Sequence, residues 1–427
     1  MSIIGKPSAA IFVILCATAC LNTGCNGEKP RNPKSTNARS ASALPPVPAS
    51  FGKQPTDEQC LDIARSIEQA IDNRDVAAAN KLFAWEALLE EATGGFDDSV
   101  ELRKATESFG KGFKEGVVGS HGLFGAIADS VEKGSTYSYL KTHTAGGQKR
   151  VLFRLILANG GINYHDFVVA VMPGDELKIR DVYVFLTGEM ISELCRRSFL
   201  PVAQQASRGL LDRLTGRENE FMQNAPRLNL MREQLRNEHF SQLLATYDSL
   251  PESLKRDKTV LLLRLQAAQG IDDNEYLAAI ADIQKYHPDD RSIHMIAIDG
   301  FLLNGQYEKA LESIDKLDRA IDGDPYLDVM RARVFLEQSK FETARKLAEK
   351  ALAADETLLD AYWVLVTSAL AAEDFDKTVA LLNTMDEKFD MEFFDLETMP
   401  EYAEFVKSPQ YDEWKRARGE KDVGETQ

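Results

Sequence analysis

The segment "GQYEKALESI", which begins at Gly305, has two related copies later in the chain. "SKFETARKLA" begins at Ser339 and "EDFDKTVALL" begins at Glu373, so each copy starts 34 residues after the one before. In every copy an aromatic residue is followed three positions later by a small or β-branched one, as in Phe341 and Ala344. Such a pair lies on one face of a helix. A fixed interval of this kind indicates one helical unit stacked on copies of itself.

A second apolar run precedes each copy: "IHMIAIDGFLL", "YLDVMRARVFL" and "AYWVLVTSALA". Each unit is therefore expected to be a helix, a short polar turn and a second helix. Neither helix can bury its apolar stripe alone, so the units must stack. The pattern resembles the tetratricopeptide repeat, whose small and aromatic positions match Ala332, Phe335, Phe341, Ala344 and Ala351. With looser upstream copies, about five helix pairs are predicted over residues 227–390, an all-α solenoid. An ordinary helical bundle is the alternative.

The resemblance implies that the first helices line a concave groove that binds a protein partner. The candidate groove residues are Met295, Asp299, Leu302, Val329, Arg333, Trp363, Thr367 and Leu370. They are apolar with scattered charge, and they lack the Lys and Asn of the carboxylate-clamp members of the family. A helix or an extended peptide with apolar anchors is the expected partner. The alternative is that the aromatic-rich segment 391–418, which is predicted to cap the last repeat, fills the groove itself.

The N-terminus has the features of a targeting segment, predicted over residues 1–25. Lys6 precedes a short apolar run that is too short for a membrane span. Small residues precede Cys20 and Cys25, which resembles a bacterial lipoprotein signal with Cys20, or alternatively Cys25, lipidated. Cleavage after Ala19 and an uncleaved anchor are the alternatives, and all three place the body in the cell envelope. Residues 26–54 contain few large apolar groups and are predicted to be a disordered tether.

Residues 55–188 are predicted to form an α+β domain, with helices first and then a four-stranded antiparallel meander. Thr56 and Gln59 form a capping-box pattern before the first helix. Residues in "NRDVAAANKLFAWEALLEEA" are expected to form a second helix. Alternation with hairpin-type connectors then predicts strands over Thr136–His143, Arg150–Leu157, Ile162–Met172 and Leu177–Leu186. This order resembles the nuclear transport factor two-like (SnoaL-like) fold, a cone-like sheet around a helix. A cystatin-like sheet is the alternative.

The resemblance implies that such a cone often holds a pocket, and some members of the family are enzymes. Arg154, Asp166 and Asp181 interrupt otherwise apolar strands and are the candidate pocket residues, with His165 as a candidate base. The alternative is that Arg154 pairs with an acid across strands or lies on the outer face, because alternation does not tell which face is inside.

Three further segments complete the expected organisation: a helical connector over 189–226, the capping helices over 391–418 and a disordered tail over 419–427. Cys60 and Cys195 both fall on apolar helix faces, where they read as small buried hydrophobes. A disulfide between them is the alternative, because an envelope compartment permits one. No cysteine and histidine spacing predicts a metal site.

The formal net charge of −17 argues against nucleic acid as a partner, because phosphate binding needs a basic face. The sequence contains no phosphate-loop ending, no nucleophile elbow and no His-Glu-x-x-His motif. The resulting expectation is an envelope-tethered, non-enzymatic scaffold without cofactors, which binds proteins through its repeats and the membrane through its lipid anchor. The alternative is a small-molecule-binding or enzymatic cone-like domain to which the solenoid is an accessory.

Overall fold

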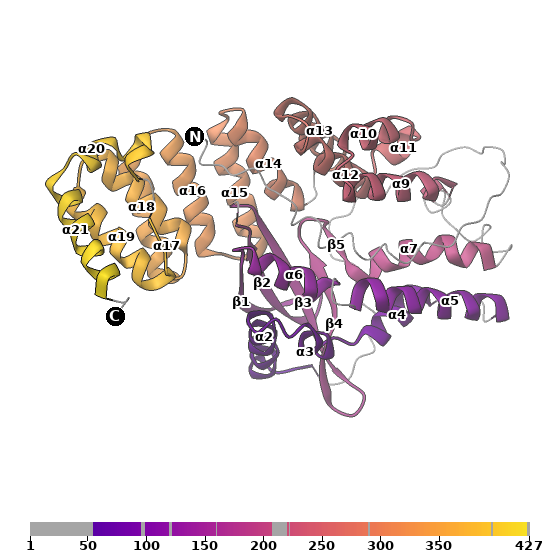
Figure 1. Cartoon of the computed structure of the whole chain (residues 1–427). Helices are drawn as coiled ribbons and strands as arrows, with labels where there is room; N and C mark the ends of the chain where they lie inside the picture. Colours follow the sequence, from indigo (N-terminus) through magenta and orange to yellow (C-terminus); the bar gives the residue numbers. More distant parts are fainter. Residues whose placement is uncertain are drawn as a thin grey trace. The chain divides into compact units, whose positions relative to one another are not determined.

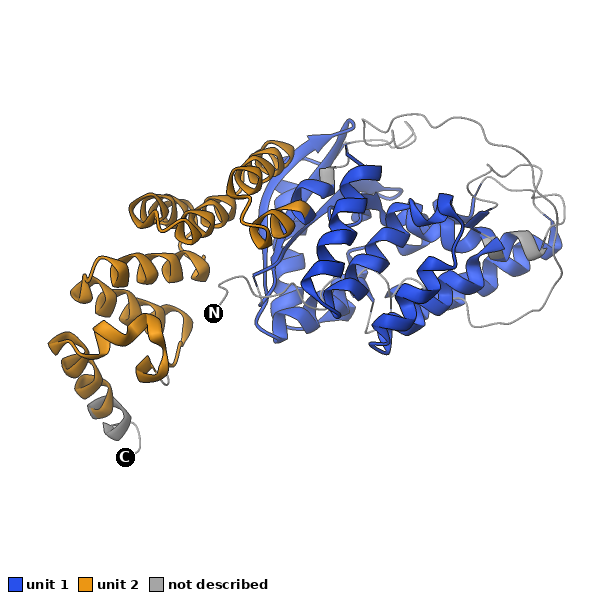
Figure 2. Cartoon of the chain, turned by 90° about the horizontal axis from the view of Figure 1, so that it is seen from above, with its two compact units in different colours: residues 1–296 blue, residues 297–427 orange. Residues whose placement is uncertain are grey.

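The computed structural model describes residues 54–94, 99–118, 122–158, 160–206, 220–221, 223–288, 291–393 and 396–424. The chain divides into two compact units, Met1–Ile296 and Ala297–Gln427, which Figure 2 colours separately. The predicted signal segment with Cys20 and Cys25, and the predicted tether up to residue 53, lie outside the described residues. None of the described helices is long and apolar enough to cross a membrane.

The first unit contains a five-stranded antiparallel sheet in which each strand pairs with the next in the chain (Figure 1). The strands are β1 Thr136–Ala145, β2 Gln148–Ile156, β3 Ile162–Met172, β4 Glu176–Val184 and β5 Glu189–Met190. The tight turn between β1 and β2 is made by Gly146 and Gly147, both at positive φ, a conformation that glycine adopts without strain. The predicted meander is thereby confirmed, followed by a mostly helical C-terminal region.

The sheet differs from the prediction at its last strand. Four strands were expected, with a helix starting at Glu189, but Glu189 and Met190 form a fifth strand that pairs with Val184 and Tyr183. The helix begins only at Ile191. Two residues are too short to give an alternating pattern, so only the pairing with β4 distinguishes this strand from a helix start.

Within the described residues, five α-helices and one π-helix precede the sheet. They are α2 Asp57–Asp72, α3 Val76–Lys81, α4 Trp85–Thr93, α5 Val100–Phe113, η2 Lys114–Val118 and α6 Leu123–Glu132. The capping box at the start of α2 is present, with Gln59 N–H donating to Thr56 Oγ1 at 3.2 Å and Thr56 N–H donating to Gln59 Oε1 at 2.9 Å. The predicted second helix is instead split into α3 and α4. It breaks because Leu82 and Ala84 exchange backbone hydrogen bonds with Ile179 of β4.

One face of the sheet carries the apolar core of this unit. Phe153 of β2 and Phe167 of β3 contact edge to face at 5.6 Å, and Phe124 of α6 stacks on Phe167 at 6.0 Å. All three rings are completely buried or nearly so. Helix α2 packs on the same sheet, where Tyr139 N–H donates to Glu68 at 2.7 Å. This face is therefore covered by the helices that precede the sheet.

The remaining elements of the first unit are helices. They are α7 Ile191–Ala206, α9 Ala225–Arg236, α10 Phe240–Asp248, α11 Glu252–Lys255, α12 Lys258–Gln269 and α13 Asp273–Tyr286. Helix α10 approaches the C-terminus of α12 so closely that a Cβ on Gly270 would lie 2.3 Å from the Phe240 ring. Gly270 therefore permits this helix contact because it has no side chain.

Helix α14, Arg291–Leu303, spans the boundary between the units, and the second unit continues as antiparallel helix pairs (Figure 1). Its helices are α15 Tyr307–Ile321, α16 Pro325–Glu337, α17 Phe341–Ala354, α18 Leu359–Ala371, α19 Phe375–Phe389, η4 Leu396–Thr398, η5 Pro400–Tyr402, α20 Ala403–Val406 and α21 Pro409–Gly424. The first helices start at residues 291, 325 and 359, and the second helices at 307, 341, 375 and 409. Both series therefore advance by 34 residues.

The turn inside each pair repeats as well. Gly305, Ser339 and Glu373 all adopt positive φ, at 63°, 54° and 54°. The left-handed conformation suits glycine, whereas Ser339 and Glu373 adopt it against steric strain on their Cβ atoms. The turn therefore has the same left-handed residue in all three copies, although two of them lack glycine.

The paired residues on the second helices are buried unequally. The small members Ala310, Ala344 and Thr378 are completely buried. The aromatic members Tyr307, Phe341 and Phe375 are only half-buried. The small residues therefore lie inside the helix packing, whereas the rings remain partly exposed to solvent.

Candidate functional site

The predicted groove residues fall into two groups by burial. Met295 is 6% exposed and Val329 is fully buried, so neither side chain is available to a partner. In the second unit α16 packs against both α17 and α18, and Val329 of α16 lies inside that packing. The other six positions are half-buried: Asp299 and Leu302 of α14, Arg333 of α16, and Trp363, Thr367 and Leu370 of α18. These six residues are called the repeat face below.

Arg333 and Thr367 of the repeat face make polar contacts within the chain. Arg333 Nη1 lies 3.7 Å from Asp360 Oδ2, and Asp360 also accepts a hydrogen bond from the Tyr326 hydroxyl at 2.6 Å. On α18 the Thr367 hydroxyl donates to the Trp363 carbonyl at 2.9 Å. The hydroxyl is thus satisfied within its own helix, and the apolar surfaces of Trp363 and Leu370 stay available for packing.

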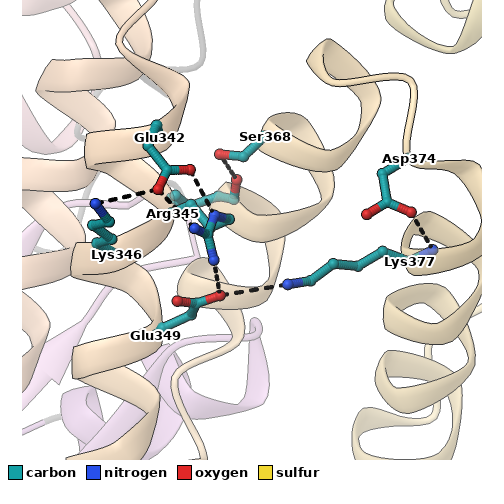
Figure 3. A network of polar contacts seen from close by, with 8 residues as sticks. Glu342, Arg345, Lys346, Glu349, Ser368, Asp374 and Lys377 are labelled. Atoms are coloured by element: carbon teal, nitrogen blue, oxygen red, sulfur yellow. Dashed lines mark hydrogen bonds and ion pairs between the residues drawn. The ribbon is translucent and has the colours of Figure 1, made fainter.

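The second helices carry a separate charge network, which Figure 3 shows from close by. Arg345 bridges Glu342 at 2.8 Å and Glu349 at 2.7 Å, and Lys377 of α19 lies 3.4 Å from Glu349. The hydrogen bond from Arg345, followed by that from Lys346, lowers the pKa of Glu342 to about 2. Glu342 and Lys346 are 63% and 69% exposed and the other members are partly exposed, so each ion pair contributes little to stability.

Arg154, Asp166 and Asp181, the predicted pocket residues, lie on one face of the sheet. Arg154 is directly opposite Tyr164, and Asp166 is two residues further along the same strand. Asp181 is opposite Val168, two residues beyond Asp166. Because side chains alternate along a strand, all three point away from the face that carries Phe153 and Phe167. They therefore lie on the side opposite to α6, which corrects the expectation of a shared pocket inside the helix-covered face.

Asp166 is the centre of a buried ionic cluster that the sequence did not predict. Arg150 Nη1 lies 3.2 Å from Asp166 Oδ2, and His143 Nε2 lies 2.8 Å from Asp166 Oδ1. Arg150 is 1% exposed and Asp166 is 3% exposed. The register places His143 opposite Arg150 and Arg150 opposite Val168, so all these groups share one face. Both carboxylate oxygens are used inside the cluster, which indicates a structural role.

Asp181 ties the sheet to α7. Its carboxylate accepts hydrogen bonds from the Ser192 hydroxyl at 2.5 Å and from the backbone N–H groups of Ser192 and Val182. Burial raises the pKa of Asp181 to about 7, although the hydrogen bond from Ser192 acts in the opposite direction. The group fixes the first turn of α7 on the edge of the sheet.

His165 lies on the helix-covered face and is completely buried. Asn163 Oδ1 accepts the backbone N–H groups of Tyr164 and Leu186, so its Nδ2 faces His165 Nε2 at 3.3 Å. Nε2 is therefore the acceptor, and Nδ1 carries the proton toward the Tyr137 hydroxyl at 3.1 Å. Burial lowers the pKa of His165 to about 4, which keeps the ring neutral. Both ring nitrogens are occupied by protein partners, which argues against a role as a general base.

A cleft of about 1050 Å³ lies elsewhere in the first unit, where the link between α3 and α4 meets the end of the β3–β4 hairpin. Its walls include Phe83, Trp85, Met172 and Lys178. Phe83 and Trp85 stack with their centroids 3.9 Å apart. The Trp85 indole nitrogen has no hydrogen-bond partner among the described residues. None of the three predicted pocket residues lines this cleft.

Cys60 and Cys195 are free thiols. Cys60 and Cys195 are both buried and no disulfide joins them, so the alternative of a disulfide is not realised. Burial raises the pKa of the Cys60 thiol to about 11, as expected for an unreactive buried cysteine. Within the described ranges no group of His, Cys, Asp and Glu side chains is arranged to hold a metal ion.

Comparison with known proteins gives no relative. No protein-family model, curated protein or solved structure matches the chain. A functional proposal therefore rests on the sequence and the structure of this chain.

Proposed function

We propose that the chain is a non-enzymatic interaction scaffold of the cell envelope, in which tetratricopeptide-like helix pairs bind a protein segment on the repeat face. The observation that carries the proposal is the 34-residue advance of both helix series together with the left-handed turn at Gly305, Ser339 and Glu373. Repeats of this kind stack into extended surfaces, and such surfaces serve protein binding. The carboxylates of Asp166 and Asp181 are contacted by neighbouring protein groups, which favours a structural role for them.

The chemistry of the repeat face favours a peptide or helix with apolar anchors. Leu302, Trp363 and Leu370 supply apolar surface, and Arg333 with Asp299 supplies both signs of charge. The envelope location rests on Lys6, the apolar run after it and the small residues before Cys20. Lipidation of Cys20, or of Cys25, would hold the scaffold at a membrane.

A matched pair of variants tests this function. Leu370→Glu places a charge on the repeat face, whereas Lys346→Glu changes a side chain that is 69% exposed on α17, the second helix of the preceding pair. The two variants, and the parent, are used to capture proteins from envelope membranes after equal unfolding temperatures have been established. A partner lost with Leu370→Glu and kept with Lys346→Glu supports the proposal. Equal capture by all three chains contradicts it.

The cleft at Phe83 and Trp85 favours a second candidate function, the binding of a small molecule by the sheet-bearing region. Its volume lies near the upper end of the range for ligand pockets, about 300–1,000 Å³. A screen of small molecules by unfolding temperature tests it, because a ligand raises stability by mass action. Ala87→Trp, which fills the cleft from α4, is the control. A compound that stabilises the parent and not this variant would favour the second function.

A further inference from the structure

The chain after α19 places an aromatic ring on the repeat face. Phe393 lies edge-on to Trp363 with ring centroids 6.1 Å apart. Its other side meets Trp414 of α21 at 6.1 Å and the Arg418 guanidinium at 5.6 Å. Phe393 is thus held in a cage of two indoles and one cation, although it remains half-buried.

The segment that carries Phe393 is weakly attached. Asp390 ends α19 with φ 52°, and the chain is then without regular structure up to Phe393. No backbone hydrogen bond of Met391, Glu392 or Phe393 is found within the described part of the chain. The segment is therefore held by the Phe393 ring. An aromatic contact of this kind is weak enough for a competing ligand to replace it.

Contacts that do not involve Phe393 hold the residues of the cage in place. The Trp414 indole N–H donates to Asn383 Oδ1 at 2.9 Å, and Arg418 pairs with Asp386 at 2.7 Å. Arg418 also lies 5.1 Å from the Trp414 ring. Trp414 and Arg418 are therefore attached to α19, and Trp363 is held by its place in α18. Removal of the Phe393 ring leaves a preformed site.

We propose that Phe393 is an internal occupant of a binding site for an aromatic side chain carried on an acidic protein segment, and that a partner binds by displacing it. The proposal rests on the proposed function, because it assigns the anchor and the regulation of the repeat face. The acidic character follows from the occupant itself, since Asp390 and Glu392 precede Phe393. It also follows from the cage, because Arg418 attracts a carboxylate as well as a ring.

A synthetic peptide tests the site without a known partner. The peptide "DEKFDMEF", residues 386–393, is titrated by calorimetry into the full chain and into Phe393→Ala. An internal occupant that fills the site 90% of the time weakens external binding about tenfold, so the variant should bind about tenfold more tightly than the parent. The matched peptide "DEKFDMEA" should bind neither chain measurably.

Two further variants separate displacement from general loosening. Phe389→Ala removes a ring that contacts Tyr362 at 5.5 Å and not Trp363, so this variant should bind the peptide as weakly as the parent. Trp363→Ala combined with Phe393→Ala should lose the binding. Equal affinity of parent and Phe393→Ala, absence of binding to both, or equal binding of the two peptides would overturn the proposal. Capture of a partner that depends on Leu370 would still support the proposed function in that case.

Discussion

The sheet and the exposed surface of α17 in the helix pairs use charged residues in opposite ways. Around the sheet, Asp166, Arg150 and Asp181 are almost completely buried, and each acid is surrounded by protein donors. On the helix pairs, Glu342 and Lys346 are 63% and 69% exposed and form ion pairs along one helix. A buried ionic group is costly when it loses a partner, whereas an exposed pair is screened by water. The comparison indicates that the sheet uses charge to fix its structure, whereas the charges on this surface of α17 are screened by water.

The largest effect is expected at Asp166. Asp166→Ala leaves the Arg150 guanidinium buried without its carboxylate, which should lower the free energy of unfolding by about 3–5 kcal/mol. Denaturant unfolding of the first unit measures it. Glu342→Ala is the counterpart on the helix pairs and should change stability far less, because Glu342 and its partner Lys346 are exposed to water. Equal effects at the two sites would remove the contrast between the regions.

Close packing of the helix pairs gives the next effect. Ala344 is completely buried, so Ala344→Leu forces additional volume between helices and should destabilise the second unit by about 1–3 kcal/mol. Phe341→Ala should be milder than the full burial value of about 3–5 kcal/mol, because the ring is half-buried. Hydrogen exchange should show loss of protection in α16 to α19 and none in β2 and β3. Loss of protection throughout the chain would contradict coupling between neighbouring repeats.

The raised pKa of Asp181 makes the stability that this group contributes to the sheet fall as the pH rises. Its pKa is about 7 in the folded chain and near 3.8 unfolded, so the folded state binds more protons between these values. Stability from this group is complete below about pH 3.9 and is lost as the pH rises through 7. Asp181→Asn should therefore gain stability relative to the parent as the pH rises from 4 to 7. Parallel pH profiles of the two chains would show that the carboxyl titrates normally.

His165 gives the stability of the sheet a pH dependence of the opposite sign to that of Asp181. Its pKa of about 4 lies below the ordinary value of 6.5, so stability falls as the pH drops from 6.5 toward 4. In His165→Gln the free energy of unfolding, measured with urea at each pH, should fall less than in the parent as the pH drops from 6.5 toward 4. A limb of unchanged steepness would mean that the ring is protonated in the folded chain.

The smallest effect concerns the turn inside each helix pair. Ser339→Gly removes a Cβ from a left-handed position and should stabilise the second unit by roughly 1 kcal/mol. Lys340, the next residue, has φ −90°, so Lys340→Gly should not stabilise. Calorimetric unfolding temperatures of the two variants distinguish them. Destabilisation by Ser339→Gly would contradict strain in the turn that exceeds the entropy which glycine adds to the unfolded chain.

Local patterns in the sequence were enough for much of this fold. The 34-residue spacing and the Thr56 capping box are set by residues close together in the chain, and alternation predicted the four long strands. Burial of Met295 and Val329 could not be predicted, because it depends on which helices pack against them. The face occupied by Arg154 was likewise undetermined, since alternation gives two faces and the packing of α6 decides which one carries the aromatic core. His143, Arg150 and Phe393 gave no signal because their partners are distant in sequence.

The most direct measurement of the central claim is photo-crosslinking from single positions of the full chain in envelope membranes. A photoreactive phenylalanine derivative is placed at Leu370 of the repeat face and, separately, at Lys346 on the exposed second helix. Binding of a protein segment on the repeat face predicts a discrete adduct from Leu370 and none of that size from Lys346. Adducts of equal yield from both positions, or an adduct from Lys346 alone, would contradict the account.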